Sequence, residues 1–268
     1  MQLKLFILSF VLTSSYALAS EKKIETNKKS IATTISLGLS TNTQKIGSKK
    51  NTFNTSLSID NSTKINEALT AGIEVSGKKN MAKDRKTVLN DPEIYLSHSS
   101  WEKKNLSLSN NFILQVPLSK ESKDITKLKA ATTWSPNLVW ANPFSFEHLK
   151  AIFLPTLTRY FHQYNKSLSG VSNGKWDIQH RLVLKATIND QWSAFIDQRY
   201  GRSFTHDGKT ADSYAFIEGV SYKINKTLST TLYFASGGNP LKENGVGNEI
   251  QVINKNGGKY GLSLSASF

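Results

Sequence analysis

The chain contains 268 residues, with no cysteine, 34 Lys and Arg against 20 Asp and Glu, and a formal net charge of +14. The absence of cysteine excludes a disulfide framework, a zinc ribbon and a thiol nucleophile. The aromatic content of 10% argues against disorder. After the first twenty residues, no apolar run reaches the roughly 18 residues of a spanning helix, which excludes a mature helical membrane protein.

The first twenty residues have the features of a secretory signal peptide. A single Lys4 precedes the apolar run 5–12, and Ala17-Leu18-Ala19 gives the small-x-small pattern of a signal peptidase site. We therefore expect a signal peptide at 1–19, a short periplasmic segment at 20–30 and one domain at 31–268. Because an exported protein rarely meets nucleic acid, we expect no nucleic-acid partner despite the basic charge.

From residue 31 onward, apolar residues recur at every second position, which is the period of a strand with one polar and one apolar side. The last segment, 260–268, is the most regular, with Gly and Ser between its apolar residues. Nine segments alternate clearly, at 31–40, 53–59, 69–76, 106–118, 134–140, 176–188, 192–196, 228–234 and 260–268, and three less regularly, near 93–99, 149–164 and 214–222. The pattern predicts twelve strands.

The connections between these strands alternate in length. Long connections are predicted at 41–51, 77–92, 119–128, 166–174, 201–211 and 237–258, and short ones at 61–66, 101–104, 141–146, 189–191 and 223–226. A soluble β-sandwich also alternates along its strands, but it has no reason to sort its loops in this way. The predicted fold class is therefore all-β, a transmembrane antiparallel up-and-down β-barrel of about twelve strands.

These features resemble a Gram-negative outer-membrane β-barrel of the porin-like class. The terminal strand 260–268 carries most of the resemblance, because the last strand of such barrels characteristically ends in an aromatic residue, here Phe268. The resemblance implies a place in the outer membrane, contact with its lipid and lipopolysaccharide, and Phe268 as the signal read by the barrel-assembly machinery. Aromatic residues near segment ends suit the interfacial girdles of a barrel: Trp134, Trp140, Trp176, Trp192, Tyr222 and Tyr260.

The polar positions of two neighbouring strands are expected to line the lumen. They are Asp177, Gln179, Arg181 and Lys185 on one strand and Asp197 and Arg199 on the next. In a pore, Arg181, Lys185 and Arg199 would favour anions, whereas in a plugged barrel the charges would pair off without conduction. Since twelve strands lie between the filled eight-stranded barrel and the sixteen-stranded channel, we expect a narrow pore for small polar or anionic solutes.

A non-conducting barrel whose basic loops bind a ligand, lipopolysaccharide or a partner is the alternative. The second long loop holds Lys78, Lys79, Lys83, Arg85 and Lys86, and the last loop, 237–258, is rich in glycine and could form a hairpin or a constriction. Three residues do not fit the alternation: Pro155 falls within a strand, and Arg159 and Glu218 continue outward series. Bulges that shift the register would explain them.

A lipid-modifying outer-membrane enzyme is the third alternative. The chain offers His98-Ser99, and Ser172-Asn173 downstream of His162, but neither gives the contiguous His-x-Ser-Asn of the phospholipases that such an enzyme would resemble. A nucleophile requires its base within hydrogen-bond reach, and nothing in the sequence holds Ser172 to His162. No metal spacing and no phosphate-binding loop are present, so we expect no catalytic residue, no metal and no cofactor.

Overall fold

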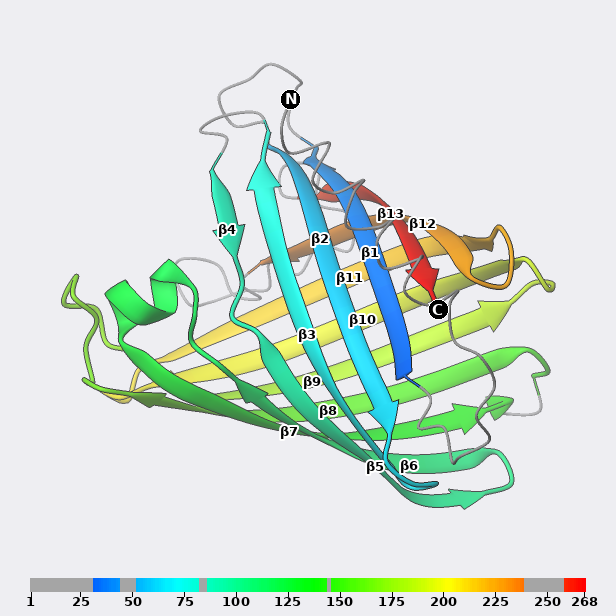
Figure 1. Ribbon diagram of the computed structural model, residues 1–268, viewed down its shortest axis with the longest axis horizontal. Helices are drawn as coiled ribbons and strands as arrows, with labels where there is room; N and C mark the ends of the chain where they lie inside the picture. The colour runs from blue at the N-terminus through cyan, green and yellow to red at the C-terminus, as the bar shows by residue number, and fades with distance from the viewer. Residues whose placement is uncertain (1–30, 44–51, 82–85, 144–145, 239–257) are drawn as a thin grey trace, which may run out of the picture. The chain divides into compact units, whose positions relative to one another are not determined.

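A computed structural model describes residues 31–43, 52–81, 86–143, 146–238 and 258–268 (Figure 1). The predicted signal peptide at 1–19 and the segment 20–30 lie outside the described residues. So do most of the first long loop, Lys83 and Arg85 in the second, and residues 239–257 of the glycine-rich loop. The predictions made for these segments stay predictions.

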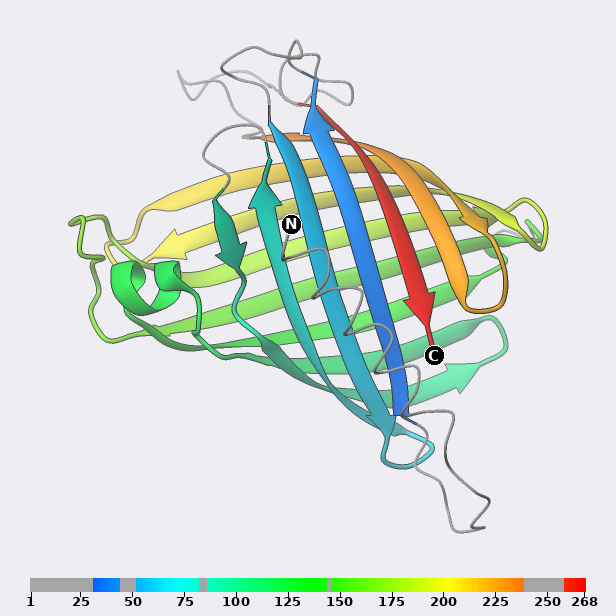
Figure 2. The ribbon, with the colours of Figure 1, turned by 45° about the horizontal axis from the view of Figure 1, so that its top comes forward.

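The described residues form one antiparallel sheet that closes on itself. Its strands are β1 (Ile31–Asn42), β2 (Phe53–Lys64), β3 (Leu69–Asn80), β4 (Thr87–Leu89), β5 (Glu93–Lys103), β6 (Leu106–Gln115), β7 (Leu128–Ala141), β8 (Leu149–His162), β9 (Gly174–Thr187), β10 (Trp192–Thr205), β11 (Thr210–Lys223), β12 (Leu228–Gly238) and β13 (Lys259–Ser267). Consecutive strands pair with each other except β4 and β5, which both pair with β3, and β1 pairs with both β2 and β13, which lies beside it in Figure 2. This pairing closes the barrel.

The barrel has the twelve strands that the sequence predicts. β4 and β5 pair with the same edge of β3, β4 at 77–79 and β5 at 69–74, so together they make one strand interrupted at 90–92. A single π-helical turn, η1 (Glu121–Thr126), lies between β6 and β7. Within the described ranges, no helix is long and apolar enough to cross a membrane.

Burial in this barrel is the reverse of burial in a soluble sandwich. Within the described residues, the buried apolar side chains apart from the prolines Pro92 and Pro143 are Leu128, Ala131 and Tyr214. Large apolar side chains on alternate positions are exposed instead, such as Leu182 and Leu184 on β9. In a closed barrel, an exposed apolar face is the outer wall that lipid covers, and the polar positions between face the lumen.

Several element boundaries differ from the prediction, among them the connection predicted at 77–92, where β3 continues to Asn80 and β4 forms at Thr87–Leu89. β6 ends at Gln115, so Val116 and Leu118 lie in the following connection, because Pro117 has no amide hydrogen for the ladder. The fifth long connection, predicted at 201–211, shrinks to 206–209, because β10 and β11 stay paired as far as Phe204 and Thr210.

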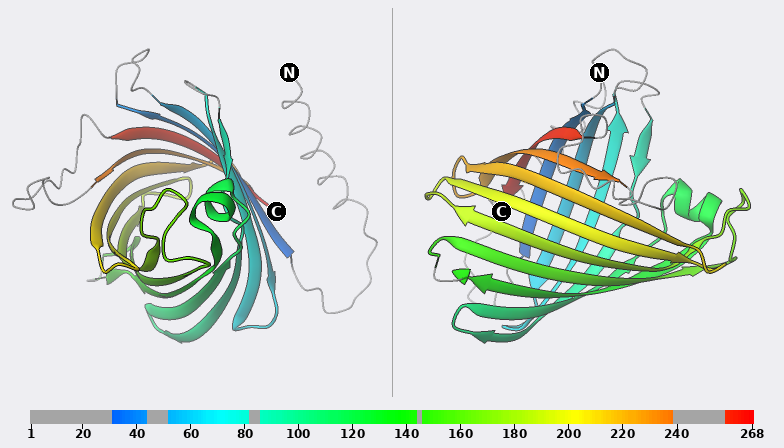
Figure 3. Two further views of the ribbon diagram at one scale, coloured as in Figure 1. Left: turned by 90° about the vertical axis from the view of Figure 1, so that its left-hand side faces the viewer. Right: turned by 180° about the vertical axis from the view of Figure 1, so that it is seen from behind.

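The register of the strands defines their tilt. In-register partners lead from Thr34, near the short-turn end of β1, across six pairings to Tyr160, near the long-loop end of β8. Rows of paired residues therefore climb toward the long loops in chain order, as expected for tilted strands in a closed barrel. Figure 3 shows this tilt on the wall formed by β7 to β11.

Arg159 and Glu218 lie on the outer wall in regular pairing, and the bulge nearest to Arg159 is in β7 between Leu128 and Ala130. Arg159 is in register with Thr132 and Trp176, and the pairing of β11 with both its neighbours is continuous around Glu218. The bulge hypothesis is therefore wrong for these two residues. The Arg159 guanidinium lies 4.5 Å from the centre of the Trp176 ring, so a cation–π contact stabilises this charge on the outer wall.

Candidate functional site: the barrel lumen

The inward face of β9 and β10 holds a compact group of charges. Arg181 and Arg199 are in register with each other, and both bind the carboxylate of Asp197. The Arg181 Nε and Nη2 atoms lie 3.0 and 2.9 Å from its two oxygens, and Arg199 Nη2 lies 2.6 Å from Oδ2. The Asp197 side chain is only 4% exposed. One carboxylate shared by two guanidinium groups leaves this part of the lumen wall with a net positive charge.

The other predicted lumen residues lie on the same face without joining this group. Lys185 is nearer the short turns, in register with Phe195 and Lys150. Gln179 and Asp177 are nearer the long loops, in register with Gly201 and Ser203. The six predicted residues thus line one strip of wall, and three of them are in contact.

An acidic row lies on another part of the wall. Period-two alternation places Glu74 and Glu93 on the inward face, but the sequence does not place them beside Asp60. Asp60, Glu74 and Glu93 are in-register neighbours on β2, β3 and β5. They are inward positions, because they alternate with exposed residues such as Val75 and Ile94. The Tyr95 hydroxyl donates a 2.7 Å hydrogen bond to Asp60. No local pattern could have revealed the row, because it depends on the register of three strands.

The acidic row and the Arg181–Asp197–Arg199 group face each other across the lumen. β3 and β5 lie four to six strands away from β9 and β10 in the ring of twelve, which places the two groups on roughly opposite walls. In-register partners lead from Glu93 to Tyr160 on β8, and Tyr160 lies six residues nearer the long loops than Leu154, the partner of Arg181. Strands are about 4.8 Å apart, each residue rises about 3.3 Å, and the tilt is about 40°. The climb from strand to strand and the six-residue descent along β8 therefore nearly cancel, so Glu93 and Arg181 differ in height by about 3 Å.

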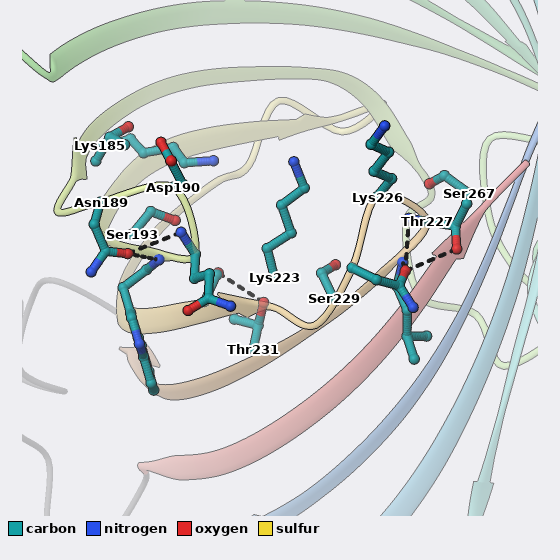
Figure 4. A pocket seen from close by; sticks show the side chains of 16 residues that line it. Lys185, Asn189, Asp190, Ser193, Lys223, Lys226, Thr227, Ser229, Thr231 and Ser267 are labelled. Atoms are coloured by element: carbon teal, nitrogen blue, oxygen red, sulfur yellow. Dashed lines mark hydrogen bonds between the residues drawn. The ribbon is translucent and has the colours of Figure 1, made fainter.

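The short-turn end of the lumen is basic. A cavity of about 400 Å³ there is lined by Lys185, Lys223 and Lys226, with Asp190 beside them (Figure 4). Lys185 and Lys223 lie near the ends of β9 and β11, and Lys226 lies in the turn after β11. This turn is fixed by a side-chain cap, because Asn225 Oδ1 accepts the amide hydrogens of Thr227 and Leu228. The turn that holds Asp190 is capped in the same way by Asn189 Oδ1, which accepts the amide hydrogens of Gln191 and Trp192.

The long-loop end is organised around Asp91, which is 9% exposed. Its carboxylate accepts hydrogen bonds from the Leu118 amide at 2.8 Å, the Ser119 amide at 2.6 Å, the Gln115 side chain and the Ser122 hydroxyl. Burial alone would raise the pKa of this carboxyl, but the hydrogen bonds from Ser122, Ser119 and Gln115 outweigh it and lower the pKa. Asp91 therefore anchors η1 to the wall beside the acidic row.

Three outer connections are hydrogen-bonded together at this end. Figure 3, left, looks onto this end of the barrel. The carbonyl of Thr126 in η1 accepts a 3.0 Å bond from the Asn173 side chain and lies 3.0 Å from His162 Nδ1. The His206 amide in turn donates to the Asn173 carbonyl at 3.0 Å. Burial, with the nearby His162, lowers the pKa of His206. The connections after β6, β8 and β10 thus form one cluster.

The residues of the enzyme alternative are placed differently from the sequence expectation. His98 Nδ1 lies 3.0 Å from Ser100 Oγ rather than against Ser99, and the Asn110 amide donates to the same hydroxyl at 2.8 Å. Within the described residues, no carboxylate or amide is hydrogen-bonded to the His98 ring, so the pair lacks an orienting third group. Ser172 is not joined to His162; its hydroxyl accepts the Asp207 amide hydrogen. The described part of the chain also holds no cluster that could bind a metal ion.

The fold matches that of outer-membrane channels of known structure. No protein-family description and no curated protein match the sequence. An outer-membrane channel from Pseudomonas putida F1 aligns over 92% of this chain and 100% of its own, with 10% identity and a TM-score of 0.60. The NanC porin aligns over 87% and 98%, with 10% identity and a TM-score of 0.53. The KdgM porin aligns over 88% and 99%, with 11% identity and a TM-score of 0.51.

At such low identity, the likeness concerns the fold. The chain has the closed antiparallel barrel of the porin-like outer-membrane class, as the sequence predicts.

Proposed function

We propose that the protein is a small passive channel of a Gram-negative outer membrane, exported by its signal peptide, that admits polar solutes and favours anions. The observation that carries the proposal is the charged inward face of the closed barrel. On that face, two arginines share one carboxylate at mid-height, and lysines gather at the short-turn mouth. An apolar, side-chain-filled interior would carry no such charges.

The mechanism requires no chemistry beyond electrostatics. Hydrated solutes diffuse down their gradient through the lumen, and fixed cations raise the local concentration of anions at the mouth. Lys185, Lys223 and Lys226 gather anions at the short-turn end, and the uncompensated charge of Arg181 and Arg199 continues the path inward. Acidic side chains on the opposite wall keep the preference modest.

The test is conductance of the refolded protein in a planar bilayer under a salt gradient. We expect open steps and a reversal potential of the sign that anions give. Neutralising Arg181, Lys185 and Arg199 together to Gln should shift the reversal potential toward zero or beyond. Arg202→Gln is the matched control, because Arg202 pairs with Asp212 on the outer wall at 2.6 Å and faces away from the lumen. Unchanged selectivity in the triple variant would overturn the assignment of the lumen cations.

A non-conducting barrel is the second candidate, and the hydrogen-bonded outer connections favour it. A bilayer that stays silent with correctly folded protein would support this candidate, and the basic loops would then be tested for binding lipopolysaccharide. A lipid-modifying enzyme would have to use the His98–Ser100 pair, so hydrolysis of phospholipid by the parent and its loss in Ser100→Ala would be needed to support it.

In this proposal, outer-membrane lipid surrounds the wall, and the barrel-assembly machinery reads Phe268 during biogenesis. The register supports a role for the terminal strand in closure, because the amides of Thr33 and Phe268 each donate to the other's carbonyl, at 3.2 and 2.9 Å.

A further inference from the structure

Three polar side chains interrupt the apolar outer wall on three consecutive strands. They are His180 on β9, Gln198 on β10 and Glu218 on β11, and we call them the outer polar belt. Each alternates with inward residues, and each has exposed apolar neighbours on its own strand, such as Leu182, Ile196 and Val220. The belt therefore faces the lipid and not the lumen.

The belt runs level around the barrel near mid-height. In register, His180 pairs with Tyr200 and Gln198 pairs with Phe216, so each step along the belt goes one strand over and two residues down. At a tilt of about 40°, the move to the in-register partner on the next strand raises the position by about 3 Å, and the two residues toward the short turns lower it by about 5 Å. The height of the belt therefore changes by only about 2 Å per strand. Glu218 lies between the aromatic pair at Tyr222, near the short turns, and Asp212, near the long loops.

The belt has polar atoms without polar partners. His180 stacks on Phe153 with ring centres 6.2 Å apart, but none of the three forms a hydrogen bond or ion pair with another described residue. Polar and ionisable groups that face lipid are costly, and they are normally satisfied by a partner inside the membrane. A groove of about 350 Å³ beside the belt, lined by Phe153, Tyr200 and Phe216, adds apolar surface for such a partner.

We propose that the outer polar belt is the contact surface for a second copy of this chain. Two copies with the same orientation in a membrane are related by a two-fold axis along the membrane normal, which preserves height and exchanges left and right. With the axis beside Gln198, His180 of one copy meets Glu218 of the other, and the reverse, while the two Gln198 amides face each other. The order imidazole, amide, carboxylate at one level is therefore self-complementary, which identifies a second copy as the partner.

Because the chain has no cysteine, single-cysteine variants give a direct test. Gln198→Cys, oxidised in native outer membranes, should yield a disulfide-linked dimer, because the two substituted residues lie next to the axis. Val75→Cys is the matched control: Val75 is an exposed outward residue in the middle of β3, on the opposite wall. Equal dimer yields from the two variants would overturn the proposal, as would cross-linking of Gln198→Cys to a different protein.

A charge exchange separates the interface from folding. His180→Glu and Glu218→His should each reduce the Gln198→Cys cross-linked fraction by about tenfold, since each places like groups opposite each other. The double variant should restore it. Folding of every variant is checked by its heat-modifiable migration in SDS. If properly folded variants all cross-link like the parent, His180 and Glu218 do not meet across the axis and the proposal is wrong. The outcome is independent of whether the barrel conducts.

Discussion

Asp197 is the most confined charge on the lumen wall, since it holds two guanidinium groups while 4% of its side chain is exposed. Removing one partner of a buried ion pair leaves uncompensated charge, so Asp197→Asn should lower the free energy of unfolding by about 3 kcal/mol. The matched control is Asp212→Asn, which breaks an outer pair with the half-exposed Arg202 and should cost much less, because solvent screens exposed charges. Urea unfolding of the barrel in lipid vesicles measures both. Equal losses would contradict the role given to Asp197.

The lowered pKa of Asp91 predicts how the stability of this part of the barrel depends on pH. Its folded pKa is depressed, so its hydrogen bonds stabilise the protein above the ordinary aspartate pKa of about 3.9, and this stability is lost as the pH falls through the lower folded value. Asp91→Asn should remove this acid sensitivity and cost about 2 kcal/mol at neutral pH, the value of charge-assisted hydrogen bonds. Amide exchange at Leu118 and Ser119, whose amides donate to Asp91, reports the loss. An unchanged pH profile of exchange in the variant would show that other groups anchor η1.

At the scale of elements, the last strand closes the barrel and, in our proposal, carries the assembly signal Phe268. An experiment can separate these two roles. β13 pairs with β1 from Asn42 to Thr34, and Phe268 adds the final backbone pairing with Thr33. Deleting Phe268 removes only that last pairing, so refolding in detergent should proceed as in the parent. If Phe268 is the assembly signal, the same deletion should sharply reduce the folded barrel recovered from outer membranes. Equal recovery in cells would contradict the assembly role, and failure in both assays would indicate a purely structural one.

The elements that sequence reasoning predicted correctly are those with a local signature. Period-two alternation identifies a strand because the two faces of each strand meet different surroundings, and the twelve strands follow this rule apart from single outward positions such as Arg159 and Glu218. A predicted strand is too long where the alternation continues beyond the last paired residue, as at Val116 and Leu118 after β6. The predicted strands of the β10–β11 hairpin are too short instead, because Arg202 and Asp212 are polar residues on its outer face, beyond the apolar band.

At the scale of the whole molecule, only half of the lumen chemistry could be predicted. Arg181, Asp197 and Arg199 lie on adjacent strands joined by a short turn, so their proximity follows from local alternation. The acidic row requires the register of β2, β3 and β5, and its place opposite the arginines requires closure of the ring. Nothing in a short window of sequence encodes either property, so the sequence predicts lumen charges of both signs but not their separation onto opposite walls.

Because the acidic row and the arginines lie on opposite walls, removing charge from one wall or the other should shift the ion selectivity in opposite directions. Glu74→Gln with Glu93→Gln removes negative charge from one wall without touching the arginines, so the reversal potential under a salt gradient should shift toward stronger anion preference. Arg181→Gln with Arg199→Gln should shift it the other way, because both sets act on ions at the same level of the lumen. Combining the four substitutions should return selectivity close to that of the parent, while raising salt should weaken every shift, since screening shortens the range of each charge. If the acidic variant left selectivity unchanged while the arginine variant altered it, ions would pass along one wall only, and the acidic row would lie outside the conducting path.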